Sequence, residues 1–198
     1  MRIRDTIGIV LLLILSPEVS ALGDPAIGRE KAARCIPCHA VDGNNPDPKI
    51  PKLTGQLPDY LLKQMLEFLS GERKDHVMSN MIRFVKTTNE LTDIAAYYSS
   101  LPAMSGSGKQ SPLVKQGKTL FLQERCMYCH NYSGKPDATF VGGAPMIGGQ
   151  NKQYLVKVLK EIRSGARKAD MHDLMKKTLA SQSDQHIEAI AEYLGSIK

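Results

Sequence analysis

The 198-residue chain has no tryptophan, only 6% aromatic residues and only four cysteines. So few large apolar side chains leave each small domain a modest core of its own. Beyond the N-terminal region, no segment approaches the ~20 apolar residues that a membrane-spanning helix needs. The alternating pattern of a half-buried β-strand is also missing. These absences predict an all-α fold of small helical domains.

The first 21 residues have the three parts of a secretory signal peptide. Arg2 and Arg4 form a charged start, residues 7–15 are an apolar run, and residues 19–21 are a small-residue cleavage site. The apolar run is too short to span a bilayer. A retained N-terminal anchor is the alternative. We expect cleavage and a periplasmic mature protein.

All four cysteines belong to two copies of the sequence Cys-x-x-Cys-His, at 35–39 and 126–130. This pattern is typical of covalent c-type haem attachment, in which both thiols bond to the haem vinyl groups and the histidine ligates iron. A redox dithiol or half of a zinc site are alternatives for each cysteine pair. Neither alternative explains why histidine follows both times. The sequence therefore predicts two haem c groups, held by Cys35, Cys38 and His39 and by Cys126, Cys129 and His130.

The second half of the chain repeats the first at a spacing of 94 residues. Residues 51–61 return at 145–155, and the sequence Ser-Gly-x-Arg-Lys at 70–74 returns at 164–168. A repeat of this length indicates duplicated domains. The Gly- and Ser-rich stretch between the copies has the composition of a flexible linker. The expected organisation is a signal peptide at 1–21, a first domain at 22–104, a linker at 105–112 and a second domain at 113–198.

Each copy contains helical patterns in matching places. Glycines at 71 and 165 are typical stop signals for the central helix of each copy, and Thr87 and Ser183 are typical N-caps for the last helix. The expected helices are Pro25–Arg34, Tyr60–Leu69, Leu113–Arg125 and Tyr154–Ile162, followed by a last helix in each copy.

The formal net charge of +6 is unevenly distributed along the chain. Residues 22–104 hold ten basic and ten acidic residues, whereas residues 105–198 hold fourteen basic and eight acidic residues. A basic half favours docking of an acidic protein partner, although a merely solvated lysine-rich surface is an alternative. Nucleic acid is disfavoured, because no aromatic residues are interleaved with the basic ones.

Methionine or a second histidine usually fills the remaining iron position in an electron carrier. Counting back from the last helix selects Met78 and Met175, whereas the 94-residue register pairs Met81 with Met175. A thioether ligand favours ferrous iron, and a filled coordination shell leaves no place for substrate. We prefer Met78 and Met175 as ligands, with Met81 and Met171 as alternatives and with His76, His172 and His186 as solvated loop or helix histidines.

The haem motifs and the repeated Pro-x-Leu/Ile-x-Gly-Gln segments resemble class I cytochromes c, and their tandem arrangement resembles the dihaem cytochrome c4 family. The resemblance implies two small helical folds, each around one haem. It implies that the carbonyl groups of Pro51 and Pro145 accept the Nδ1 protons of the haem histidines. It also places Gly28 and Gly117 where the first helix of each domain crosses the last.

As a function, the resemblance implies a periplasmic carrier of single electrons, with no enzymatic activity and no small-molecule substrate. Its donor would be a respiratory complex or a dehydrogenase, and its acceptor a terminal oxidase or reductase. Redox proteins, including membrane-bound respiratory complexes, are the expected partners. The main alternative is a dihaem electron-transfer subunit of a periplasmic sulfide or thiosulfate dehydrogenase. A catalytic dihaem enzyme such as a peroxidase is a third possibility and requires an open iron position.

Overall fold

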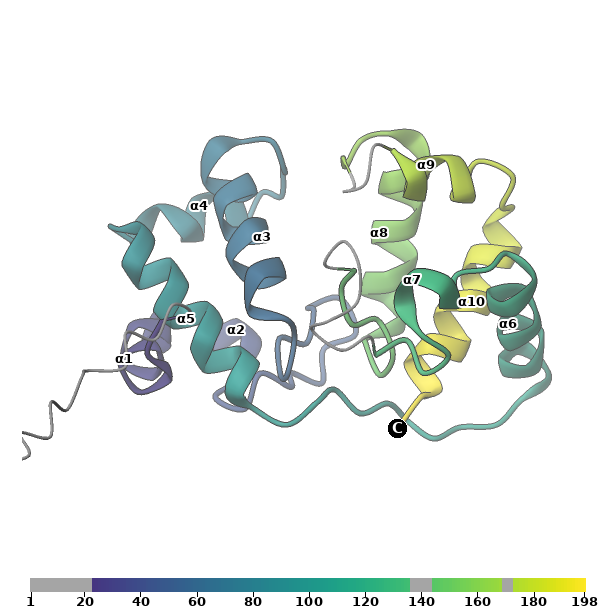
Figure 1. Cartoon of the computed structure of the whole chain (residues 1–198), viewed down its shortest axis with the longest axis horizontal. Coiled ribbons are helices and arrows are strands. Elements are labelled where there is room, and N and C mark those ends of the chain that lie inside the picture. Colours follow the sequence, from purple (N-terminus) through teal and green to yellow (C-terminus); the bar gives the residue numbers. More distant parts are fainter. Residues whose placement is uncertain (1–22, 136–143, 169–172) are drawn as a thin grey trace, which may run out of the picture.

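The computed structural model describes residues 23–135, 144–168 and 173–198. Figure 1 shows two groups of helices side by side, joined by an extended connection. The described residues contain no β-strand, so the predicted all-α fold is confirmed. No described helix is long and apolar enough to cross a membrane. The helical elements are α1 (Pro25–Lys31), η1 (Ala32–Arg34), α2 (Ile36–His39), α3 (Pro58–Ser70), α4 (Met78–Met81), η2 (Ile82–Phe84), α5 (Thr88–Ser100), α6 (Pro112–Gln123), α7 (Met127–His130), α8 (Lys152–Ser164), α9 (Leu174–Leu179) and α10 (Asp184–Ser196).

The first and last helices of each half cross at a glycine. A Cβ atom on Gly28 of α1 would lie 1.9 Å from the carbonyl oxygen of Asp93 on α5. A Cβ atom on Gly117 of α6 would lie 1.9 Å from the carbonyl oxygen of Ala189 on α10. Only a residue without a side chain allows backbones to approach this closely. The expected crossing of the helices at these two glycines is confirmed.

The apolar cores differ between the halves. In the second half, α6, α8 and α10 surround a single cluster that includes Phe121, Ile187 and Leu194, all almost completely buried. In the first half, the buried residues form two clusters, one around Tyr97 and Tyr98 and one around Phe68. The central helices α3 and α8 contribute one apolar stripe each to these cores, as their helical spacing predicts.

The ends of the long helices follow local sequence signals. The side-chain oxygens of Thr87 and Ser183 each accept a hydrogen bond from the backbone N–H three residues later, which caps α5 and α10. Gly71 and Gly165 end α3 and α8 in the left-handed conformation, with φ of 81° and 80°. The predicted stops and caps are therefore confirmed.

The two halves meet through two reciprocal glutamines. The side-chain amide of Gln56 donates to the carbonyl of Met146 and accepts from its N–H, both at 2.9 Å. The amide of Gln150 makes the same pair of bonds with the backbone of Lys52, at 2.9 and 2.8 Å. Both glutamine side chains are buried, with 4% of their surface exposed. Because both members of each pair are 94 residues apart from their counterparts, the interface has approximate two-fold symmetry.

The connection between the halves is anchored to the second half. The backbone N–H groups of Gly106, Ser107 and Gly108 donate to carbonyls at the end of α10. Met104 is fully buried, and its sulfur accepts a hydrogen bond from Gln150. The composition of residues 105–112 predicts a flexible linker. In the structure this segment is extended, and its backbone is hydrogen-bonded to the end of α10. The difference arises because glycine and serine allow a backbone to lie flat against a neighbouring chain end.

Candidate haem sites

The first cysteine pair and its histidine lie on one short helical turn. The N–H of His39 donates to the carbonyl of Cys35 at 2.8 Å, and the N–H of Cys38 donates to it at 3.1 Å. This turn brings two thiols and an imidazole together on one short segment. His39 is buried, with 5% of its surface exposed, and its Nδ1 lies 3.1 Å from the carbonyl oxygen of Pro51.

The second cysteine pair has the same arrangement on α7. The N–H of His130 donates to the carbonyl of Cys126 at 3.0 Å. Its imidazole is equally buried, and its Nδ1 lies 3.0 Å from the carbonyl oxygen of Pro145. Pro145 follows its histidine by fifteen residues, whereas Pro51 follows its histidine by twelve. The structure thus has both proline contacts that the resemblance implies.

The proline contacts fix the chemical state of both imidazoles. A carbonyl oxygen can only accept a hydrogen bond, so Nδ1 must carry the proton and Nε2 keeps its lone pair. Burial lowers the pKa of His39 and of His130, and the smaller opposing effect of the proline carbonyls does not reverse this. Both rings are therefore neutral near pH 7 and available as metal ligands through Nε2.

The cysteines do not have the properties of a reactive redox dithiol. Burial, assisted by Cys38, raises the pKa of Cys35 above its usual value. Burial is also the largest influence on Cys126, and its pKa is raised to about 11. A disulfide oxidoreductase instead needs a lowered pKa at the first cysteine of the pair. Among the described residues, no three His, Cys, Asp or Glu side chains come together as a zinc site would require.

The candidate methionine ligands occupy matching places after the central helices. Met78 begins α4 and packs against the cluster around Phe68, and Met175 lies in α9 and packs against the second core. Met81, at the end of α4, is also partly buried. Met171 and His172 lie outside the described residues. The choice between neighbouring methionines stays a prediction.

Two histidines that we did not assign to iron, His76 and His186, belong to other segments of the chain than the cysteine pairs. His76 is exposed in the loop before α4, and His186 lies on α10, with its Nδ1 3.2 Å from the side-chain oxygen of Gln182. Both positions agree with the expected loop and helix histidines.

Two buried polar groups fit a bound group that carries carboxylates. Among the described residues, the hydroxyl of Tyr98 and Nη1 of Arg167 are the buried side-chain polar atoms without a hydrogen-bond partner. Buried polar atoms are rarely left unpaired in a folded protein. A haem has two propionate groups that can accept such bonds. The residues present therefore fit a haem in each half, with the thiols and imidazoles already placed for its attachment.

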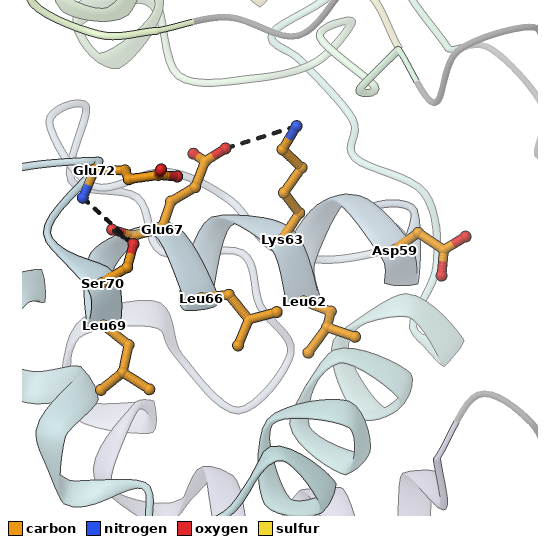
Figure 2. A pocket seen from close by; sticks show the side chains of 8 residues that line it. All are labelled: Asp59, Leu62, Lys63, Leu66, Glu67, Leu69, Ser70 and Glu72. Carbon is orange, nitrogen blue, oxygen red and sulfur yellow. Dashed lines mark hydrogen bonds and ion pairs between the residues drawn. The ribbon is translucent and has the colours of Figure 1, made fainter.

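One hollow of the described surface is lined by none of the cysteines of the two pairs. It has a volume of about 590 Å³ and lies along α3. Figure 2 shows Leu62, Leu66 and Leu69 pointing to one side of α3 and the ion pair of Lys63 and Glu67 on the other, and all five residues line the hollow. Because the hollow includes none of the cysteines or histidines, it is not a haem site.

Sequence reasoning missed the residues that join the halves. Gln56 and Gln150 recur in the repeat, and so do Arg73 and Arg167, but the sequence did not assign a role to either pair. In both pairs the same polar residue occupies the same position of the repeat. The position of Lys52, by contrast, is occupied by Met146 in the second copy. Retention of glutamine or arginine beside apolar residues suggests a buried hydrogen bond.

Taken together, the fold and these sites define a helical c-type cytochrome with two haem-binding domains. The family model for cytochrome c matches residues 114–198. Cytochrome c4 of Pseudomonas aeruginosa is 37% identical over 95% of this chain and 96% of its own length. The crystal structure of reduced recombinant cytochrome c4 from Pseudomonas stutzeri superposes with a TM-score of 0.81 at 35% identity, covering 89% of this chain and all of that one.

A further relative is a thiosulfate dehydrogenase electron acceptor of Thiomonas intermedia. It is 31% identical, over 84% of this chain and 79% of its own length. The chain belongs to the cytochrome c4 family, whose members are dihaem electron-transfer proteins. It carries two haem c groups.

Proposed function

We propose that this protein carries single electrons between a respiratory donor complex or dehydrogenase and a terminal oxidase or reductase in the periplasm. The observation that carries the proposal is the pair of buried, neutral imidazoles, each beside two thiols and each oriented by a proline carbonyl. Haem, when bound, supplies a one-electron couple between ferric and ferrous iron. The chain's own residues attach it, orient its histidine ligand and exclude water.

Met78 and Met175 are the proposed second iron ligands. Both are partly buried in the cores of their halves and follow the central helix in each. A neutral, soft thioether stabilises ferrous iron and raises the reduction potential. With both positions filled, neither iron offers a site to a substrate, so the proposal includes no enzymatic activity.

Ligand replacement tests these assignments. Met78→Ala and Met175→Ala should each remove half of the weak far-red absorption of iron–methionine bonding, while Met81→Ala should leave it intact. Loss of the band in Met81→Ala and its retention in Met78→Ala would reverse the assignment in the first half. Carbon monoxide binding to one haem of the reduced wild-type protein would instead favour a catalytic dihaem enzyme.

The basic second half is the proposed docking face for an acidic partner. Fourteen basic and eight acidic residues lie between 105 and 198, whereas charges balance between 22 and 104. Attraction between oppositely charged surfaces speeds association and is screened by salt. The rate of electron transfer to the partner should therefore fall as ionic strength rises. A rate independent of ionic strength would contradict this docking mode.

A role beside a sulfur-compound dehydrogenase is the second candidate function. It is favoured by the similarity to the thiosulfate dehydrogenase electron acceptor of Thiomonas intermedia. Reduction of the purified protein by thiosulfate together with a thiosulfate dehydrogenase, and co-purification of the two, would support it. Reduction only by a quinol-oxidising complex would support the first candidate.

Export to the periplasm rests on the N-terminal segment, which lies outside the described residues. The charged start, the apolar run at 7–15 and the small residues at 19–21 support cleavage after Ala21. Intact mass of the purified protein tests this together with haem attachment. The expected mass is that of residues 22–198 with two haems; a retained segment would identify an anchor.

A further inference from the structure

Two arginines and two tyrosines form a cross-domain cluster where α3 faces α8 (Figure 1). Nη2 of Arg73 donates to the hydroxyl of Tyr154 at 3.1 Å, and Nη2 of Arg167 donates to the hydroxyl of Tyr60 at 2.9 Å. Each arginine thus binds a tyrosine of the opposite half. Arg167 follows Arg73 by 94 residues and Tyr154 follows Tyr60 by 94, so the two contacts are symmetry counterparts.

The symmetry fails at Gln64, whose counterpart in the second half is Val158. The side-chain oxygen of Gln64 accepts from Nη1 of Arg73 at 2.8 Å and from Nη2 of Arg167 at 2.7 Å. Valine offers no such acceptor. Tyr60 and Gln64, which both accept from Arg167, lie on α3, so these bonds hold a cation of the second half against the first half.

The two arginines also differ in burial and pairing. Arg167 has only 7% of its surface exposed, whereas Arg73 is partly exposed and lies over the ring of Phe68, 4.4 Å from its centre. Among the described residues, no carboxylate lies within ion-pair distance of Arg167. A guanidinium group keeps its charge at all ordinary pH values, and a buried charge without a counter-ion costs several kcal/mol.

An anion would offset this cost, and Nη1 of Arg167 is buried without a hydrogen-bond partner. The haem groups of this family are a suitable source of the anion, because each haem carries two propionate carboxylates. Arginine binds carboxylates through strong charge-assisted hydrogen bonds. A free anion such as phosphate is the other source of the same chemistry.

We propose that Arg167 is an electrostatic positioning residue at the domain boundary: its free Nη1 binds a haem propionate, and its cation raises a haem reduction potential more than Arg73 does. The inference rests on the proposed electron-carrier function. A nearby positive charge favours the ferrous state, which carries one positive charge fewer than the ferric state. Burial reduces solvent screening at Arg167, whereas Arg73 is partly exposed to solvent.

Potentiometric titration of the holoprotein tests the inference with a matched pair of variants. In Arg167→Gln, the equilibrium constant for reduction of one haem should fall about tenfold, which is about 59 mV for one electron. In Arg73→Gln, the change should stay below about threefold. Gln64→Val, which copies the residue of the second half and leaves both cations in place, should change the constant less than twofold. Equal shifts in the two arginine variants, or no shift in either, would overturn the inference.

Two further measurements keep the test decisive if Arg167→Gln is poorly folded. Arg167→Lys retains the charge but cannot reach Tyr60, Gln64 and a carboxylate at once, so it should lower the same constant about threefold, and Arg73→Lys should leave it unchanged. Equal effects of both lysine variants would contradict the asymmetry. Addition of phosphate should not change the wild-type potentials; a shift that disappears in Arg167→Lys would show a free anion in place of the propionate. Failure of the carrier function itself would instead appear as absence of two reducible haems.

Discussion

Gln56→Glu is the sharpest test of the interface between the halves. The substitution keeps the size of the side chain and its ability to accept from the N–H of Met146. It replaces the donating amide group by an oxygen that faces the carbonyl of Met146, where the wild-type distance is 2.9 Å. The side chain also accepts from the N–H of Leu57 at 3.0 Å, so its position is closely defined.

At neutral pH, Gln56→Glu destabilises the docked state for two reasons. A buried carbonyl left without its donor costs about 1–3 kcal/mol. Burying an unpaired carboxylate costs more, and the group limits this cost by raising its pKa, at about 1.4 kcal/mol for each pH unit. We expect Gln56→Glu to destabilise the docked state by about 2–4 kcal/mol near pH 7.

The pH dependence separates this mechanism from simple misfit. The folded-state pKa of the new carboxyl should lie above its unfolded value of about 4.3, so the protonated form is favoured in the fold. A protonated carboxyl donates one hydrogen bond and accepts another, as the amide does. The stability difference from wild type should therefore shrink as pH falls from 7 towards 4.

Two variants serve as controls for the charge and for the burial. Gln150→Glu places a carboxylate at the symmetry-related site, where Nζ of Lys52 lies 2.9 Å from the neighbouring carbonyl of Gly149 and can compensate it. It should cost less than Gln56→Glu. Gln153→Glu lies on the exposed face of α8 and should change stability by less than about 0.5 kcal/mol.

Urea denaturation at pH 7 and 4, followed by circular dichroism and by haem absorption, measures these differences. Scattering at low angle reports whether the halves separate before they unfold. The reasoning is wrong if the cost of Gln56→Glu is the same at both pH values, or if it is as small as that of Gln153→Glu.

The remaining predictions concern single domains and one ion pair. Gly28→Ala should lower the free energy of unfolding by at least about 3 kcal/mol, measured by thermal unfolding, because its Cβ would overlap a carbonyl of α5. Gly71→Ala meets no neighbouring atom and should lower it by about 1 kcal/mol, because alanine disfavours the left-handed φ. Thr87→Ala should cost about 1 kcal/mol by removing the cap of α5. Burial raises the pKa of Asp75, but hydrogen bonds from Lys157 and two backbone N–H groups outweigh this and lower it. The pair joins the halves at 2.7 Å but is partly exposed, so Asp75→Asn should cost about 0.5 kcal/mol at neutral pH, and this difference should disappear as pH falls below about 3.9.

The long helices and their ends could be predicted because their signals are local. An apolar stripe at helical spacing, an N-cap and a glycine stop lie within one segment, and each acts without reference to distant residues. The short helices α4 and α9 were not predicted. Helices of four and six residues are too short for a periodic pattern, and they form because tertiary packing holds them.

The haem attachment residues could be predicted for a different reason. Two thiols and an imidazole must lie on one turn, so the chemistry imposes a fixed spacing that a sequence displays directly. The contacts of Gln56, Gln64 and Arg167 depend on how two halves meet. No local pattern encodes that docking, and a sequence shows only that a polar residue is retained.

The interface itself indicates how the two halves came to be joined. Gln56 contacts the backbone at 146 while Gln150 contacts the backbone at 52, so the same contact occurs twice with the roles exchanged. Such reciprocity is the property of an isologous dimer interface. A duplicated chain that keeps it holds its two haem domains in the relation that two separate copies would adopt.

The exposed faces are free of that constraint and have diverged. Leu66 and Leu69 are exposed on α3, whereas the matching positions on α8 are Lys160 and Arg163, which both bind Asp184 at the start of α10. The two glutamine contacts are thus shared where the halves meet, whereas these surface positions differ. A carrier whose donor and acceptor differ needs two unlike docking surfaces, so that each partner can bind its own half of the molecule. The shared interface can keep the relation between the two haem domains fixed while these surfaces diverge.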